Sequence, residues 1–394
     1  MSAAKDEEDK PVEDISDINV VTKYKKAAEI ANDALSAVIK SVKIGGKVVD
    51  ACQVGDDYIM EQTGKVYNKA RPRVEKGIGF PTCVSVNHIV GHFSPLSDDT
   101  STFKEGDLVK IDLGVHIDGY VAVAAHTVVV GDKPATGKKA DVLMAAHVAA
   151  ECAIRMLRPG GKNEDMTKMF TQVADDFKVN VVQGVLSHQL ERNVIDGEKV
   201  IASKFDPENP ESKVEFEYDQ NEVYAIDIVM SSGDGKPKEF EQRMTVFKRD
   251  MESTYQLKMK ASRAVFSDIK ERFGAFPFTM RAMDEKKGKF GIRECLTHSL
   301  VQGYPVLQEK DGEVVAHIKF TALLTSSGTA KISGLDVDLS KISTEYSVKN
   351  EEIKKILATE IAKKKKKRNR KKKNKKKDDA KKAPKDEENK KEEA

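Results

Sequence analysis

The stretch Glu105–Val130, EGDLVKIDLGVHIDGYVAVAAHTVVV, constrains the fold more than any other segment. Strand-forming residues fill both halves, and Asp118-Gly119 between them is a dipeptide that favours a two-residue hairpin turn. The sequence therefore predicts two antiparallel strands. Asp112 lies on the first strand, and Val123 is expected roughly opposite, on the same face of the second. A carboxylate at each position could bridge two divalent ions about 3.5–4 Å apart, but one carboxylate and one valine cannot.

Length and composition indicate an intracellular globular protein. The chain has 394 residues, 39% of them hydrophobic, enough for a large core in one domain or two similar halves. Its start is acidic and lacks the apolar stretch of a signal peptide, and the longest apolar-rich run, Val142–Ile154, is too short to span a bilayer. The cysteines lack CxxC spacing, so we expect them to be reduced. They are Cys52, Cys83, Cys152 and Cys295.

The net charge of +3 conceals a strong asymmetry. Residues 363–394 hold 18 Lys and Arg against 7 Asp and Glu, a net charge of +11, which leaves −8 for residues 1–362. Of the 15 residues from Lys363 to Lys377, 13 are basic, a density at which self-repulsion prevents a packed structure. Such a segment neutralises phosphates in a salt-sensitive way, and it can also direct a protein to the nucleus or nucleolus.

Hydrophobic periodicity predicts helices and strands on both sides of the hairpin. Helices are expected at Val21–Val42, Val48–Thr63, Lys138–Leu157 and Asn163–Phe177. Strands are expected within residues 77–95 and 214–233, and at Val306–Glu309 and Val314–Leu324. A last helix, capped by Asn350, would present one apolar stripe made of Ile353, Ile356, Leu357 and Ile361.

Residues 257–298 differ in charge from the chain around them. They hold ten Lys and Arg against five Asp and Glu, a net charge of +5 on an otherwise acidic body. Ser262 could cap a helix here that is closed by Gly274. We expect this segment to contact structured RNA by shape and backbone, because it lacks the aromatic residues of an RNA-recognition motif.

The order of these pieces resembles the type 2 methionine aminopeptidases. Four segments carry the resemblance, which covers about residues 20–345, and they read FPTCVSVNHIVGHFSP, KEGDLVKIDLGVHIDGYVAVAAHT, NEVYAIDIVMSSGDG and AHIKFTALL. The resemblance implies an α/β (α+β) pita-bread fold, and residues 257–298 resemble the helical insert that separates type 2 enzymes from type 1.

That family binds two metal ions through five residues, and this sequence departs from the set. Asp112 matches the first aspartate, whereas Val123 stands at the second. Val185 stands at the ligand histidine, with His188 as an alternative because of a length difference nearby. Asp227 replaces a glutamate, and Lys319 takes the position of the last one. His92 matches the active-site histidine of the family.

Valine offers no lone pair, and an ammonium group repels a divalent cation. We therefore expect no bound metal or other cofactor and no aminopeptidase activity, and we expect Lys319 to neutralise Asp112 or Asp227. The rival interpretation is an active metalloaminopeptidase with an atypical site made of Asp112, His188 and Asp227. A third is a binding protein that uses the remnant pocket without chemistry.

Loss of the ligands together with a polybasic tail is most similar to the proliferation-associated, or ErbB-receptor-binding, protein family. Membership implies a non-catalytic RNA- and ribosome-associated protein of the cytoplasm, nucleus and nucleolus, linked to growth control, ribosome biogenesis, translation and transcription. The implied partners are rRNA and other structured RNA, the large ribosomal subunit, and receptor-tail or transcription-regulator proteins. We expect a monomer that does not insert into membranes.

These expectations assign residues and boundaries. The domain boundaries are a disordered acidic N-terminus (1–17), a pita-bread domain (18–345) with an insert (257–298), a C-terminal helix (346–362) and a disordered basic tail (363–394). The RNA-binding residues expected in the tail are Lys363, Lys364, Lys365, Lys366, Lys367, Arg368, Arg370, Lys371, Lys372, Lys373, Lys375, Lys376 and Lys377. A second set on the insert consists of Lys258, Lys260, Arg263, Lys286, Lys287 and Lys289.

Overall fold

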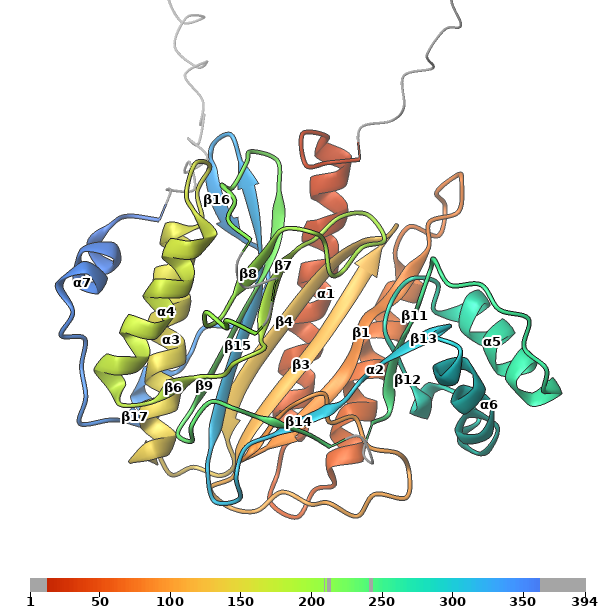
Figure 1. Ribbon diagram of the computed structural model, residues 1–394, viewed down its shortest axis with the longest axis horizontal. Helices are drawn as coiled ribbons and strands as arrows, with labels where there is room; N and C mark the ends of the chain where they lie inside the picture. The colour runs from red at the N-terminus through yellow and green to blue at the C-terminus, as the bar shows by residue number, and fades with distance from the viewer. Residues whose placement is uncertain (1–12, 209, 211–213, 241–243, 362–394) are drawn as a thin grey trace, which may run out of the picture. The chain divides into compact units, whose positions relative to one another are not determined.

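The computed structural model describes residues 13–208, 210, 214–240 and 244–361 (Figure 1). The basic tail lies outside these residues, as does the expected disordered N-terminus up to residue 12. Residues 13–17, the rest of that expected segment, belong to the folded body. Ile15 is buried there, and the Asp17 side chain caps the first helix by accepting a hydrogen bond from the backbone N–H of Asn19.

Nine strands of the described chain form the central sheet (Figure 1). In spatial order they are β1 (Lys76–Val86), β3 (Leu108–Ile117), β4 (Tyr120–Val129), β15 (Val315–Thr325), β9 (Val223–Ser231), β7 (Leu186–Gln189) and β8 (Val200–Ala202), with β16 (Gly328–Lys331) beside β15 and β6 (Asn180–Val181) beside β9. Strands from both ends of the sequence therefore meet at the centre, where β4 adjoins β15.

The predicted hairpin is confirmed as β3 and β4. Asp118 and Gly119 both have positive φ angles, 55° and 81°, as a tight two-residue turn requires. Because this turn pairs Ile117 with Tyr120, the register sets Asp112 opposite Ala125. Val123 instead pairs with Gly114, so it lies on the predicted face but diagonal to Asp112. Its expected position opposite Asp112 is wrong by two residues.

Four helices cover one face of the sheet. They are α1 (Ile18–Ser41), α2 (Val48–Lys65), α3 (Lys138–Met156) and α4 (Asn163–Phe177), close to the four predicted spans. Alternate strand residues such as Ile111 and Leu113 pack in the core with α1 and α2, and Ile226 and Phe320 pack with α3 and α4. The residues between them, Asp112 among them, face the other way because side chains alternate along a strand.

The insert leaves the body between β11 (Val246–Arg249) and β13 (Val301–Tyr304), which pair with each other. It contains α5 (Lys260–Arg272), β12 (Phe278–Thr279), the 3-10 helix η3 (Met280–Ala282) and α6 (Glu285–Thr297). Ser262 does not cap α5, since the helix begins two residues earlier and Ser262 is buried within it. The Glu294 carboxylate of α6 instead accepts the backbone N–H groups of Lys258 and Met259.

The remaining elements lie around the sheet. They are β2 (Ile89–Gly91), β5 (Ala135–Thr136), β10 (Lys238–Phe240), β14 (Val306–Gln308), η4 (Leu339–Lys341), β17 (Ile342–Ser343) and α7 (Glu351–Ala358). Asn350 caps α7 as predicted, and Ile353 is buried. The predicted apolar stripe ends too late, because α7 stops at Ala358 and Ile361 is exposed.

Two expectations about the whole chain can be compared with the described residues. The four cysteines are free and buried, in agreement with the absence of a disulfide framework. None of the described helices combines the length and the apolar character needed to cross a membrane.

Candidate functional site

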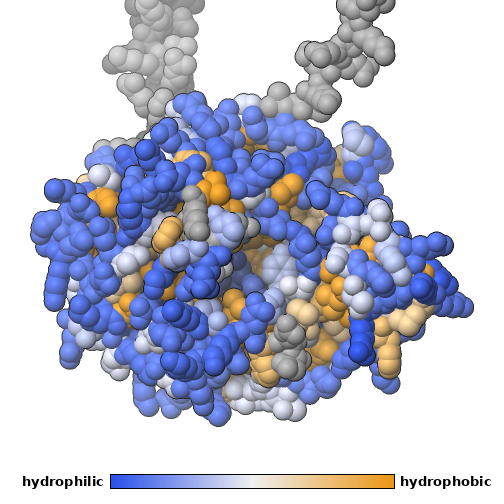
Figure 2. Space-filling model, viewed as in Figure 1, coloured by the Kyte–Doolittle hydropathy of each residue, from blue (hydrophilic) through white to orange (hydrophobic). Residues whose placement is uncertain are grey.

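A cavity of about 240 Å³ lies over the face of the sheet that α1–α4 leave uncovered. Figure 2 shows a hollow near the centre of this face, within a largely hydrophilic surface. The cavity contains all six residues expected of a remnant metal site, together with residues that the sequence did not single out. The expected six are His92, Asp112, Val123, Val185, Asp227 and Lys319.

The sheet register sets three charged residues in one line across four adjacent strands. Asp112 on β3 pairs with Ala125 on β4, Ala125 pairs with Lys319 on β15, and Lys319 pairs with Asp227 on β9. We call Asp112, Lys319 and Asp227 the charged row. The small side chain of Ala125 leaves room for the lysine to reach across β4 to Asp112.

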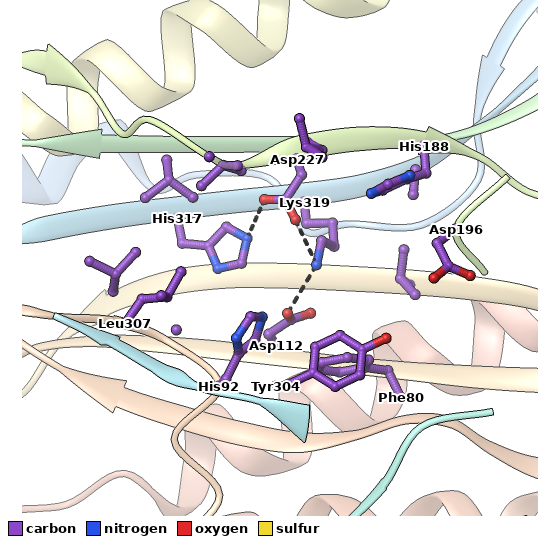
Figure 3. A pocket seen from close by; sticks show the side chains of 18 of the residues that line it. Phe80, His92, Asp112, His188, Asp196, Asp227, Tyr304, Leu307, His317 and Lys319 are labelled. Carbon is purple, nitrogen blue, oxygen red and sulfur yellow. Dashed lines mark hydrogen bonds and ion pairs between the residues drawn. The ribbon is translucent and has the colours of Figure 1, made fainter. Parts of the chain in front are cut away.

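Lys319 bridges the two carboxylates (Figure 3). Its Nζ lies 3.0 Å from Oδ2 of Asp112 and 2.7 Å from Oδ2 of Asp227. The three side chains are only 15%, 9% and 12% exposed, in the order Lys319, Asp112, Asp227. The sequence-based hypothesis that Lys319 neutralises these aspartates is confirmed, and it does so with both at once.

The pKa shifts of Lys319 and Asp227 show how strongly these two groups depend on their neighbours. Burial by itself favours the uncharged form of Lys319, but the two carboxylates outweigh it and hold the pKa of the ammonium well above its ordinary value. Burial would likewise raise the pKa of Asp227, yet Lys319 and His317 lower it well below its usual range. Lys319 and Asp227 are therefore both ionised throughout the neutral pH range.

His317 belongs to the site, although sequence reasoning missed it. Its Nε2 donates to Oδ1 of Asp227 at 2.7 Å, since an ionised carboxylate can only accept. Strand alternation could have found this residue, because it stands two positions before Lys319 and therefore on the same face of β15.

His92 lies at the opposite wall of the cavity. Its Nδ1 donates to the carbonyl oxygen of Pro305 at 3.0 Å, and its ring packs edge-on against Tyr304 and near Phe80. Burial lowers the pKa of the imidazole, with the charge of Lys319 acting in the same direction, so His92 is neutral at pH 7.

The two remaining expected residues and the alternative His188 also line the cavity. Val123 and Val185 contribute apolar walls. His188 on β7 pairs with Ala225, two residues before Asp227, so it shares the face of the charged row. Figure 3 shows its ring to one side of Lys319, with no interaction drawn to the row.

These side chains do not fit a pair of divalent ions. Lys319 stands between the carboxylates that would have to bridge the metals, and its ammonium repels a cation. Val123 and Val185 supply no donor atom. Among the described residues, no group of three or more His, Cys, Asp and Glu side chains is placed to hold a metal ion.

Comparison with known proteins agrees with this architecture. Residues 22–246 match metallopeptidase family M24. ERBB-3 binding protein 1 of Arabidopsis thaliana is 48% identical and covers 91% of this chain and 90% of its own length. Proliferation-associated protein A of Dictyostelium discoideum is 46% identical, with 91% and 93% covered. The chain belongs to the proliferation-associated branch of family M24.

Solved structures extend the comparison to the fold. A thermophilic Arx1 superposes with a TM-score of 0.81 at 31% identity, over 88% of this chain and 100% of that chain. The predicted pita-bread fold is confirmed by this likeness and by the family match. The M24 body is thus retained.

Proposed function

We propose that this M24 protein is a non-catalytic, RNA-binding adapter of the large ribosomal subunit, acting in ribosome biogenesis, translation and growth control in the cytoplasm, nucleus and nucleolus. The observation that carries the proposal is the place of Lys319, which pairs with both Asp112 and Asp227. Transcriptional regulation and binding to receptor tails belong to the same proposal as secondary roles.

The non-catalytic part follows from the charged row. An M24 peptidase needs metal ions to activate water, and here the carboxylates already hold a cation that cannot do so. A lysine whose pKa is raised keeps its proton at neutral pH, so it is not a general base either. His92 remains without a metal-bound water to act on.

The RNA-binding part follows from the density of positive charge in the basic tail, residues 363–394. The basic tail carries a net charge of +11, and neutralising phosphates releases their counterions, so binding is strong at low salt and tolerant of sequence. The tail lies outside the described residues, and its composition is what supports this role.

The insert offers a second basic surface, on folded elements. All six expected residues are exposed. Lys260 of α5 and Lys287 of α6 line one groove between the two helices. Lys287 and Lys289 have acidic neighbours at 3.4 and 3.5 Å, whereas Lys286 has no ion-pair partner among the described residues. Exposed pairs of this kind are weak and leave the charge available to a polyanion.

Co-sedimentation with purified ribosomal subunits over rising salt tests the proposal. We expect the full chain to pellet with the large subunit, and a chain ending at Ala362 to bind more weakly with a shallower salt dependence. The small subunit serves as the matched control. Failure of both chains to sediment with the large subunit at low salt would contradict the proposal.

A further inference from the structure

We propose that Arg281 is a positioning residue, which fixes the orientation of the insert relative to the sheet, and that binding to the large ribosomal subunit requires this fixed orientation. The second half of the proposal rests on the proposed function, whereas the first half concerns the protein alone. The inference gives the insert a role beyond its charge, because a surface that is already ordered loses less conformational entropy on binding.

The Arg281 side chain leaves the insert and ends inside the body of the protein. It belongs to η3, and it is only 6% exposed. Its Nη2 pairs with the Asp56 carboxylate, and its Nε donates to Oε1 of Gln53 at 3.2 Å, both on α2. Its Nη1 donates to Oγ of Ser94 and to the carbonyl oxygen of Pro95, both at 3.0 Å. One side chain thus joins the insert to α2 and to the loop after β2.

Asp56 is in turn fixed from the side of the sheet. Its Oδ1 accepts the backbone N–H of Thr82 on β1 at 2.8 Å, while its Oδ2 faces Arg281. The helix α2 approaches β1 closely here because Gly55 has no side chain, and an added Cβ would lie 2.4 Å from Oγ1 of Thr82. The body therefore presents a carboxylate in a fixed place, and the insert supplies the cation that neutralises it.

Two further contacts of charged side chains link the insert to the loop after β2, and both are exposed to solvent. Glu285 accepts the backbone N–H and the hydroxyl group of Ser97, and Lys289 lies 3.5 Å from Asp98. Exposed pairs contribute little to stability. Within the described residues, Arg281 makes the only buried ion pair that joins the insert to the rest of the chain.

The basic surface of the insert is closely connected to this anchor. It lies to one side of the sheet, on α5 and α6 (Figure 1). The helix α6 begins three residues after η3 ends, so a change in the orientation of η3 would carry Lys286, Lys287 and Lys289 with it. A fixed η3 therefore holds these three exposed lysines in one orientation relative to the sheet.

Hydrogen exchange of the full chain tests the first half without any partner. The double variant Asp56→Asn/Arg281→Met removes both buried charges, which avoids the cost of an unpaired carboxylate and keeps an acceptor for Thr82. We expect amide exchange in α5 and α6 to become about tenfold faster, with exchange in α1 and α3 unchanged. The matched control is Arg73→Met, at an exposed position before β1, which should leave all four helices unchanged.

The role of Arg281 is overturned if exchange in α5 and α6 stays as in the unaltered chain, or if it rises no more than exchange in α1 and α3. The single variant Arg281→Met gives a second reading of the same ratio. There the overall stability also falls, so the ratio between the insert and the other helices is again the quantity that decides.

Co-sedimentation with the large subunit tests the second half. We expect the double variant to bind about tenfold more weakly with an unchanged salt slope, because no exposed charge is lost. Arg73→Met should bind as the unaltered chain does. Equal binding of the double variant, with its insert shown to be loosened, would overturn the requirement for a fixed orientation. Failure of the unaltered chain to bind would overturn the proposed function and this requirement with it, while hydrogen exchange would still decide the role of Arg281.

Discussion

Lysine side chains in the sheet and on the insert have opposite surroundings. Lys319 is 15% exposed and held between two carboxylates, whereas Lys286 is exposed on α6 and makes no ion pair within the described chain. The buried charge is paired with two carboxylates inside the sheet. The exposed charge has no partner within the described chain and stays available to a polyanion.

A second buried lysine shows that burial alone does not explain Lys319. Lys110 on β3 is 1% exposed and donates to the carbonyl oxygen of Asn87 at 2.7 Å. Burial lowers its pKa well below the ordinary value, despite the charge of Asp107. Lys319 shifts the other way because two carboxylates contact it directly. Direct contact with carboxylates therefore decides which buried lysine is held in its charged form.

The largest effect should come from removing the buried cation. Lys319→Met leaves Asp112 and Asp227 buried without their shared partner, so we expect the free energy of unfolding at pH 7 to fall by about 3–5 kcal/mol. Chemical denaturation monitored by circular dichroism measures this. Lys286→Met is the matched control, with an expected change under about 0.5 kcal/mol. An unchanged denaturation curve for Lys319→Met would show that the charged row does not stabilise the fold.

A smaller effect should appear when the free energies of unfolding of the unaltered chain and of Lys319→Met are compared at acidic pH. The pKa of Asp227 is depressed in the folded state, so the stability it contributes is complete above its unfolded pKa of about 3.9 and is lost as the pH falls below that value. In Lys319→Met the carboxylates gain stability on protonation instead. The difference in the free energy of unfolding between the unaltered chain and Lys319→Met should therefore shrink by about 1–3 kcal/mol between pH 7 and pH 3. A gap that is constant with pH would mean that Asp227 is not coupled to Lys319.

The smallest effect on stability should come from the insert. Reversing Lys286, Lys287 and Lys289 to Glu should change the free energy of unfolding by less than about 0.5 kcal/mol. The affinity for ribosomal RNA should nevertheless fall by about tenfold, with a salt slope lower by about 1–3. Filter binding over rising salt measures both quantities.

A control variant for that experiment reverses the charge of three lysines outside the insert. Lys40, Lys43 and Lys47 are exposed at the end of α1 and before α2, and their reversal should weaken RNA binding less. Equal losses in the two variants would mean that only net charge matters. Undiminished binding of the insert variant would assign RNA binding to the tail alone.

Local chemistry predicted the centre of the sheet well. The Asp118-Gly119 turn and the alternating pattern were sufficient to give the hairpin and the face of Asp112. The register was wrong by two residues, because the two-residue turn pairs Asp112 with Ala125 and not with Val123. The pairing of β4 with β15 joins segments about 190 residues apart, which no local pattern contains. For that reason the sequence suggested a contact of Lys319 with one aspartate, while the structure shows a bridge between two.

The insert shows where local rules fail. Ser262 matches the preference for a helix cap, yet α5 begins earlier because the chain entering it is held by Glu294, more than thirty residues away. His317 was missed for a different reason. A histidine within an apolar strand is usually structural, and its role here comes from the hydrogen bond to Asp227 on the neighbouring strand.

Metal titration combined with a peptidase assay tests the central claim most directly. The full chain is titrated with Mn²⁺ or Co²⁺ by calorimetry and then incubated with a Met-Gly peptide, with an active methionine aminopeptidase as the positive control. We predict no stoichiometric metal binding at the charged row and no release of methionine, because Lys319 already holds both carboxylates. Stoichiometric binding and hydrolysis that both disappear in Asp112→Asn would contradict the account.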